Sequence, residues 1–328
     1  MCSSFEPHDD FVAPEHPVER SLLGGEPRYR KSEVARLAGV ELSRAERLWQ
    51  AMGFAHVSDE SVVFTDLDVT ALRTVVQLVS AEVIPPELET AVARSLAQTM
   101  SRLAEWQMGI FRSVLGESFS DDMATTARFA DAILPVMEDL QNYVWRRHLS
   151  AVAVRELNER DTRPEEPTLV VGFADIVGYT RLIRDYSELE LAGLIDAFEE
   201  LVTGVIAENH GRIVKTVGDE VLFVADTVRE AGEIALSLNE RVAAESLLPP
   251  LRIGLAKGRV LARFGDVYGS TVNIASRLTT LARPASVLVD RECAREMHEL
   301  AGFALTGLGP NKVPGFRGLE AWALRRAR

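Results

Sequence analysis

Residues 168–180 read TLVVGFADIVGYT, and this stretch decides the fold of the second half of the chain. The run from Leu169 to Ala174 is apolar and rich in valine, which predicts a short strand buried on both faces. Asp175 closes the run, and Gly178 permits a tight turn into the helix expected next. The pattern therefore predicts a carboxylate at the end of a buried strand.

A second motif, KTVGDEVLF, occupies residues 215–223. Two apolar runs around Gly218 and Asp219 predict a hairpin with the aspartate at its tip. Two carboxylates, each beside a glycine, suit hard oxygen-liganded cations such as Mg²⁺, with nucleotide phosphates as the third party. The alternative is a pair of unconnected turn aspartates, and these two motifs alone favour neither interpretation.

The third motif, FGDVYGSTVNIASRL, covers residues 264–278. It places Asp266 at the end of a strand, followed by Asn273 and Arg277 four residues apart on one helical face. An amide and a guanidinium on one face can hold a ribose oxygen and a phosphate together. A solvated helix face is the alternative, but the apolar residues that flank this pair indicate a partly buried helix.

Outside these motifs, the chain after Pro167 alternates short apolar runs with amphipathic helices. A long helix is expected over residues 179–209, and the last strand contains LEAWAL at 319–324. This order predicts a sheet covered by helices, in the α+β or ferredoxin-like class.

Residues 168–327 resemble the catalytic domain of class III nucleotidyl cyclases, specifically adenylate cyclases. The resemblance covers about half the chain and rests on the three motifs, which occur in family order with fitting spacing. It implies a ferredoxin-like catalytic domain over residues 168–328. It also implies an enzyme, a phosphorus–oxygen lyase that converts ATP into 3′,5′-cyclic AMP and pyrophosphate.

The same resemblance implies a metal site. Asp175 and Asp219 would bind two Mg²⁺ or Mn²⁺ ions per active site, helped by the backbone carbonyl of Ile176. The family has a further phosphate-binding lysine in a Leu-Lys-Gly turn, where residues 313–315 of this chain read VPG. Lys312 lies one or two residues away and is the candidate replacement.

Base and ribose recognition are implied as well. Lys215 and Asp266 would read the base, Asn273 would position the ribose, and Arg277 would contact the phosphates. Adenine presents an acceptor at N1 and a donor at N6, which a lysine and an aspartate complement, whereas guanine reverses this pattern. In the family the metal aspartates come from one subunit and the base and ribose residues from the other, so a homodimer is expected.

The first half of the chain is expected to be helical, with a flexible arm over 1–27, a helical domain over 28–150 and a linker over 151–167. Thr65 stands where a helix N-cap is expected. Residues 29–54 resemble the start of a winged helix-turn-helix. More of this half resembles the helical regulatory region of soluble, pH-responsive mycobacterial adenylate cyclases. That resemblance implies inhibition at neutral or alkaline pH and makes the region a candidate site for an apolar ligand such as a fatty acid.

Composition excludes several classes of protein. The 328 residues are 47% hydrophobic and 26% charged, which is ordinary for a globular protein of about two domains. The two cysteines, Cys2 and Cys293, are too few for a disulfide framework or a thiolate metal site. No apolar run approaches the roughly 18 residues of a membrane span, so a cytoplasmic protein is expected.

Charge argues against a nucleic-acid partner. The net charge is −13, of which residues 1–150 carry −9 and residues 151–328 carry −4. Neither half has the positive excess that phosphate backbones attract, so DNA binding by the first half is disfavoured.

Two other functions stay open at this point. VGDEV, at 217–221, is superficially similar to the Gly-Gly-Asp-Glu-Phe loop of diguanylate cyclases, although the spacing of Asn273 and Arg277 argues against that family. The other is a catalytically weak nucleotide-sensing or DNA-binding regulator. The full set of metal, base and ribose residues disfavours it, but the departure at Pro314 keeps it open.

Overall fold

The computed structural model describes residues 17–116, 122–158, 166–244, 248–313 and 316–327. The chain divides into two compact units, residues 1–155 and 156–328. Each unit has its own core, as the length of the chain predicts. Of the helices in the described ranges, none is long and apolar enough to cross a membrane.

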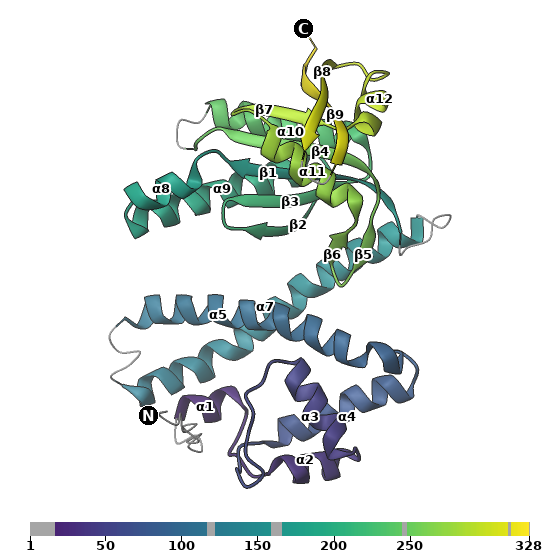
Figure 1. Ribbon diagram of the computed structural model, residues 1–328. Coiled ribbons are helices and arrows are strands. Elements are labelled where there is room, and N and C mark those ends of the chain that lie inside the picture. Colours follow the sequence, from purple (N-terminus) through teal and green to yellow (C-terminus); the bar gives the residue numbers. More distant parts are fainter. Residues whose placement is uncertain (1–16, 117–121, 159–165, 245–247, 314–315, 328) are drawn as a thin grey trace, which may run out of the picture. The chain divides into compact units, whose positions relative to one another are not determined.

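The first unit is helical, as predicted (Figure 1). Its elements are α1 (Pro17–Leu22), α2 (Lys31–Ala38), α3 (Leu42–Ala51), α4 (Asp66–Ser80), the 3₁₀ helix η1 (Pro86–Leu88), α5 (Glu89–Leu115) and α7 (Met123–Asn158). The short helix α1 lies within the segment for which a flexible arm is expected. The last helix, α7, runs into the segment expected to be a linker.

Local capping and a small core explain the compact part of this unit. Thr65 caps α4 as predicted, because its side chain accepts a hydrogen bond from the Leu67 N–H at 3.2 Å and Asp68 accepts one from the Thr65 N–H at 2.7 Å. Helices α2, α3 and α4 bury one apolar cluster. Within it, Trp49 stacks on Phe64 with ring centroids 4.8 Å apart.

The second unit is built on a mixed sheet of seven strands in the order β2-β3-β1-β4-β7-β9-β8. Only the pairing of β4 with β7 is parallel among the described strands. The strands are β1 (Thr168–Ile176), β2 (Arg212–Val217), β3 (Glu220–Ala225), β4 (Leu251–Arg259), β7 (Ser286–Val289), β8 (Phe303–Val313) and β9 (Phe316–Arg326). Two further strands, β5 (Leu261–Arg263) and β6 (Asp266–Tyr268), form a separate ribbon that projects from the sheet (Figure 1).

Helices cover both faces of this sheet. The main core lies between one face and the helices α9 (Glu188–Glu208), α10 (Val228–Ala244) and α12 (Arg291–Met297). The other face packs against α11 (Ser270–Leu281). The α+β sheet with its helical layers confirms the predicted fold class.

One expected element is divided in two. The helix predicted over 179–209 is α8 (Tyr179–Asp185) followed by α9. Ser187 begins the second helix, because its side chain accepts a hydrogen bond from the Glu190 N–H while the Glu190 carboxylate accepts one from the Ser187 N–H. This capping box competes with continuation of the first helix, and apolar periodicity does not reveal it.

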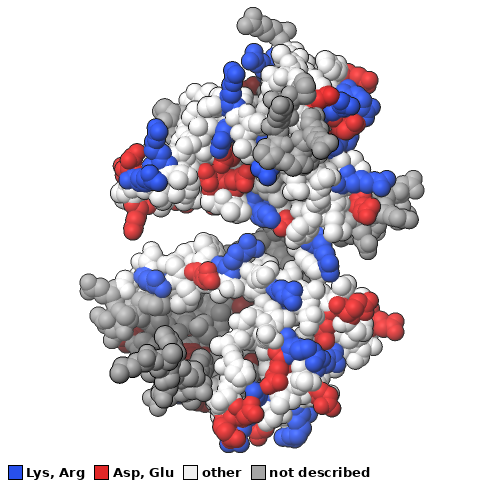
Figure 2. Space-filling view, in the orientation of Figure 1, with Lys and Arg blue, Asp and Glu red and all other residues white. Residues whose placement is uncertain are grey.

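Charged side chains of both signs are scattered over the face that Figure 2 draws. Figure 2 shows Lys and Arg side chains interspersed with Asp and Glu side chains on the face that it draws. The absence of a nucleic-acid partner remains a prediction.

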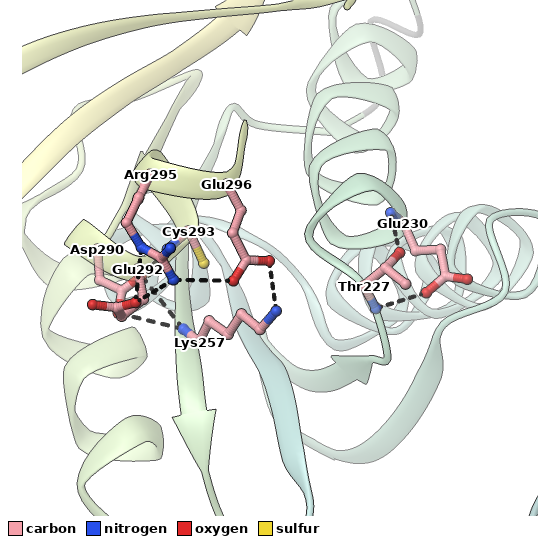
Figure 3. Close-up of polar contacts among 8 residues, drawn as sticks. All are labelled: Thr227, Glu230, Lys257, Asp290, Glu292, Cys293, Arg295 and Glu296. Carbon is pink, nitrogen blue, oxygen red and sulfur yellow. Dashed lines mark hydrogen bonds and ion pairs between the residues drawn. The ribbon is translucent and has the colours of Figure 1, made fainter. Parts of the chain in front are cut away.

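Polar contacts fasten α12 to the sheet (Figure 3). The buried carboxylate of Asp290 accepts a hydrogen bond from the Cys293 N–H at 2.9 Å and so caps the helix. Lys257 of β4 pairs with Glu296 of α12, with 2.6 Å between Nζ and Oε2. The cap and the ion pair together fix the helix against β4.

Asp290→Ala is expected to lower the free energy of unfolding by about 1 to 2 kcal/mol, because the cap is lost. Asp290→Asn keeps an acceptor but removes a charge, and burial raises the pKa of Asp290 above its ordinary 3.8. A raised folded-state pKa means that this group destabilises the native protein increasingly as the pH rises through that pKa. The free energy of unfolding of the asparagine variant, measured in urea and taken relative to that of the wild type, should therefore rise between pH 4 and pH 7. An asparagine variant as unstable at pH 7 as the alanine variant would contradict this.

Candidate active site

The end of β1 gathers three carboxylates and one guanidinium. The register of the sheet places Asp175 opposite Glu220 of β3 on one side and opposite Arg252 of β4 on the other. Asp219, in the turn between β2 and β3, is held beside the end of β1, because the Ile176 N–H donates to its backbone carbonyl at 3.1 Å. The two aspartates from separate motifs therefore meet, and the interpretation as unconnected turn residues is wrong.

Asp175, Asp219 and Glu220 form a carboxylate cluster in which the like charges repel one another. Burial raises the pKa of Asp219, and the neighbouring Asp175 raises it further. Burial also raises the pKa of Glu220 to about 6, with Asp175 and Asp219 adding to the effect. Arg252 offsets part of this charge, since its guanidinium donates to Asp175 Oδ2, with Nε at 3.0 Å. Three carboxylates against one cation leave an excess of negative charge that a bound cation would relieve.

The donor set fits divalent metal ions. Carboxylate oxygens and a backbone carbonyl, here Asp175, Asp219 and Ile176, are the hard ligands that Mg²⁺ prefers, with water and phosphate oxygens completing its coordination. Within the described ranges, no group of three or more His, Cys, Asp or Glu side chains has metal-binding geometry. A metal here would therefore depend on the two aspartates, the Ile176 carbonyl, water and oxygens supplied by the substrate.

A second pair of predicted residues also comes together. Lys215 of β2 and Asp266 of β6 form an ion pair with 2.6 Å between Nζ and Oδ2. Asp266 is held independently, because its Oδ1 accepts a hydrogen bond from the Val267 N–H at 2.8 Å. The Lys215 side chain is 41% exposed and that of Asp266 is 24% exposed, so a ligand can reach both. The alternative of Lys215 as a merely solvent-facing residue is therefore not what the structure shows.

Asn273 and Arg277 lie on the exposed side of α11, with apolar neighbours buried on the opposite side. Gly254 of β4 permits this packing, because a Cβ there would stand 2.4 Å from backbone atoms of α11. Among the contacts of the described residues, none joins Asn273 or Arg277 to the carboxylate cluster or to the Lys215–Asp266 pair. The structure thus presents three groups of candidate residues, two of them internally connected.

The last candidate cannot be placed. The backbone of Lys312 belongs to β8, but its side chain lies outside the described part of the chain, as do Pro314 and Gly315. Whether Lys312 replaces the family's phosphate-binding lysine therefore remains a prediction.

Comparison with known proteins agrees with this geometry. The family described as "Adenylate and Guanylate cyclase catalytic domain" matches residues 163–326. The chain belongs to this cyclase family. It is 43% identical over 298 residues to an adenylate cyclase of Streptomyces coelicolor, a match that covers 90% of this chain and 77% of the relative. A Streptomyces griseus adenylate cyclase is 41% identical over 301 residues, covering 89% and 73%.

The similarity to cyclases extends through the helical unit. A pH-sensitive adenylate cyclase of Mycobacterium tuberculosis is 29% identical over 314 residues, which covers 91% of this chain and 78% of that protein. Because the match is far longer than the cyclase domain, the first unit is shared with these relatives too.

Two residues of the carboxylate cluster were not expected from the sequence. Arg252 is the single charged residue in the apolar run LRIGLA at 251–256, which is a signal that the cyclase motifs do not contain. Glu220 directly follows Asp219, and its burial against two other carboxylates appears only when β1 and β3 are paired. Arg252 offsets the negative charge of the predicted aspartates, and Glu220 adds to it.

Proposed function

We propose that this cyclase is an adenylate cyclase that converts ATP into 3′,5′-cyclic AMP and pyrophosphate. The observation that carries the proposal is the pairing of Lys215 with Asp266. It sets one donor beside one acceptor, which is the pattern that matches the N1 acceptor and N6 donor on the adenine edge. The relatives named adenylate cyclase support the same substrate.

The reaction joins the ribose 3′-oxygen to the α-phosphorus and releases pyrophosphate and a proton. Positioning and charge neutralisation make up most of this task. Asp175, Asp219 and the Ile176 carbonyl would hold two divalent cations. Such cations, when bound, neutralise phosphate charge and make the 3′-hydroxyl easier to deprotonate.

The other residues of the chain hold the nucleotide. Lys215 would donate to adenine N1 and Asp266 would accept from N6, which fixes the base. Asn273 would hold the ribose, and Arg277 would stabilise charge on the phosphoryl oxygens as the bond forms. The three motifs contain no histidine or cysteine to act as a nucleophile, so we propose direct attack without a covalent intermediate.

The test of this function is a product assay with ATP and GTP in parallel, with Mg²⁺ or Mn²⁺. Cyclic AMP should form from ATP at least about tenfold faster than cyclic GMP forms from GTP at equal substrate concentration, since guanine presents the opposite edge to the Lys215–Asp266 pair. Faster cyclic GMP formation, or a diguanylate product, would overturn the proposal.

The active form is proposed to be a homodimer with its sites at the subunit interface. Four apolar side chains are exposed around the Lys215–Asp266 pair, on β2 and on the β5–β6 ribbon, namely Val217 at 63%, Leu261 at 44%, Phe264 at 45% and Tyr268 at 51%. Exposed apolar surface beside a binding site is typical of a protein interface. A second copy of the chain would cover it and would bring the metal residues of one subunit to the base residues of the other.

Mixing two inactive variants should restore activity. Asp219→Ala lacks a metal residue and Asn273→Ala lacks the ribose residue, so each homodimer is inactive. Random exchange makes half of the dimers mixed, each with one intact site of two, which predicts up to about a quarter of wild-type activity. Mixing Asp219→Ala with Asp175→Ala is the matched control, because both changes fall in the same half-site. Activity in the control, or none in the test mixture, would contradict shared sites.

Regulation of catalysis by the first unit is also proposed, in the form of inhibition at neutral pH that acidification relieves. Support comes from the 91% coverage by the pH-sensitive relative. Deleting residues 1–150 should raise cyclic AMP formation at pH 7.5 and flatten the dependence of the rate on pH. The rate is measured from pH 5 to pH 8 beside the full chain. An unchanged pH profile in a truncated protein that is still dimeric would rule out this inhibition.

A further inference from the structure

A pocket in the first unit lies between α3 and the loop that follows it. Its volume is about 360 Å³, within the range of roughly 300 to 1,000 Å³ that is usual for small-molecule sites. The side chains that give it chemical character are Lys31, Glu46, Trp49, Phe54, His56 and Phe64. All of these belong to the helical unit, and none of them is a residue of the proposed cyclase site.

Aromatic rings form much of its wall. Trp49 and Phe64 are buried and stacked on each other, so their positions are fixed by the core. Phe54 lies in the loop after α3 and is 57% exposed, although it is large and apolar. A flat apolar ligand could cover Phe54 and contact the buried rings, which burial of aromatic area favours.

The one ammonium group of the pocket lining, that of Lys31, is paired with two carboxylates, of which Glu46 lines the pocket and Asp59 does not. Lys31 is only 5% exposed and forms ion pairs with Glu46, at 2.9 Å, and with Asp59, at 2.5 Å. These bonds raise the pKa of Lys31, which therefore stays an ammonium group that two carboxylates already neutralise. Glu46 is 44% exposed, and within the described part of the chain only its Oε1 is engaged. Oε2 of Glu46 is thus available to a ligand.

The charges and rings around the pocket indicate the charge of its ligand. Glu46 of the lining and Asp59 together outnumber the ammonium group of Lys31, and the faces of aromatic rings carry a negative electrostatic potential, so both features attract a cation. A fatty acid would bring its carboxylate against Glu46, and the one lysine of the lining is already paired. We propose that this pocket binds a small organic cation with a flat apolar body, which inserts between Phe54 and the Trp49–Phe64 stack and pairs with Glu46.

Three probes of one shape and different charge test the proposal on the full-length protein. They are (2-naphthylmethyl)trimethylammonium, 2-naphthylmethanol and 2-naphthylacetate, titrated by calorimetry at pH 8 without nucleotide and with a chelator. The cation should bind at least about tenfold more tightly than the anion. Phe54→Ala should weaken binding of the cation about fivefold or more, and Glu46→Gln should reduce the preference for cation over anion by a similar factor.

Two controls locate the binding. Leu67→Ala removes another apolar side chain of the first unit, 56% exposed and outside the pocket, and should change affinity less than twofold. Asp266→Ala alters the nucleotide site and should leave probe binding unchanged. If Glu46→Gln fails to fold, Phe54→Ala decides alone, because the exposed side chain contributes little to the core.

Several results would overturn the proposal. They are no saturable binding of the cation, equal or tighter binding of the anion, unchanged affinity in Phe54→Ala, or loss of binding in Asp266→Ala. None of these readouts depends on turnover, so failure here is distinguishable from failure of the proposed cyclase activity.

Discussion

Asp175→Ala and Asp219→Ala are each expected to lower kcat for cyclic AMP formation by about 10³-fold or more. Each variant removes one of the two side chains proposed to hold the divalent cations, and the only other protein ligand proposed is the Ile176 carbonyl. Initial rates with saturating ATP and a range of Mn²⁺ and Mg²⁺ concentrations measure the effect. Because the loss arises from metal binding, high metal concentration should restore part of the rate.

Stability separates the metal role from a structural role. Asp175→Ala removes the ion-pair partner of Arg252 and should lower the free energy of unfolding. Asp219→Ala removes a carboxylate whose pKa is raised by burial and by Asp175, so stability without metal should be unchanged or higher. Asp226→Ala, which changes an exposed carboxylate beyond the far end of β3, is the control and should keep full activity. An Asp219→Ala protein with the kcat of the wild type would contradict the assignment.

Lys215→Ala is expected to lower kcat/KM for ATP by about 10²-fold while changing that for GTP little. The variant removes the donor proposed for adenine N1, whereas guanine carries a proton at N1 and cannot accept a hydrogen bond from the lysine there. Asp266 should stay in place, because the Val267 N–H still donates to it. The measured quantity is the ratio of kcat/KM for ATP to that for GTP, which should fall by a similar factor.

Lys257→Ala is the matched control for this change. Lys257 forms an ion pair of the same 2.6 Å length with Glu296 and is likewise half-buried, but it joins β4 to α12 (Figure 3). Its loss should cost stability without changing the ATP to GTP ratio. An equal change of the ratio in both variants would show that any lost ion pair disturbs the enzyme. An unchanged ratio in Lys215→Ala would refute base recognition by this residue.

Local sequence patterns were sufficient for much of the fold. The apolar run before Asp175, the hairpin around Asp219 and the helix that carries Asn273 and Arg277 all appear as predicted. Their signals extend over neighbouring residues, where strand or helix periodicity and glycine turns act directly. The break between α8 and α9 was not predicted, because a capping box at Ser187 overrides apolar periodicity that continues through it.

The residue types of the candidate site could be predicted from the motifs, but the contacts that these residues make could not. The sequence by itself determined an α+β cyclase domain, a helical first half and the aspartates at two strand ends. Only the tertiary structure brought Arg252 to Asp175 across 77 residues and Lys215 to Asp266 across 51. It also enclosed an aromatic pocket over a buried lysine in the first unit. Such contacts depend on strand order and register, which are set by the packing of the whole sheet and its helices and by no single segment.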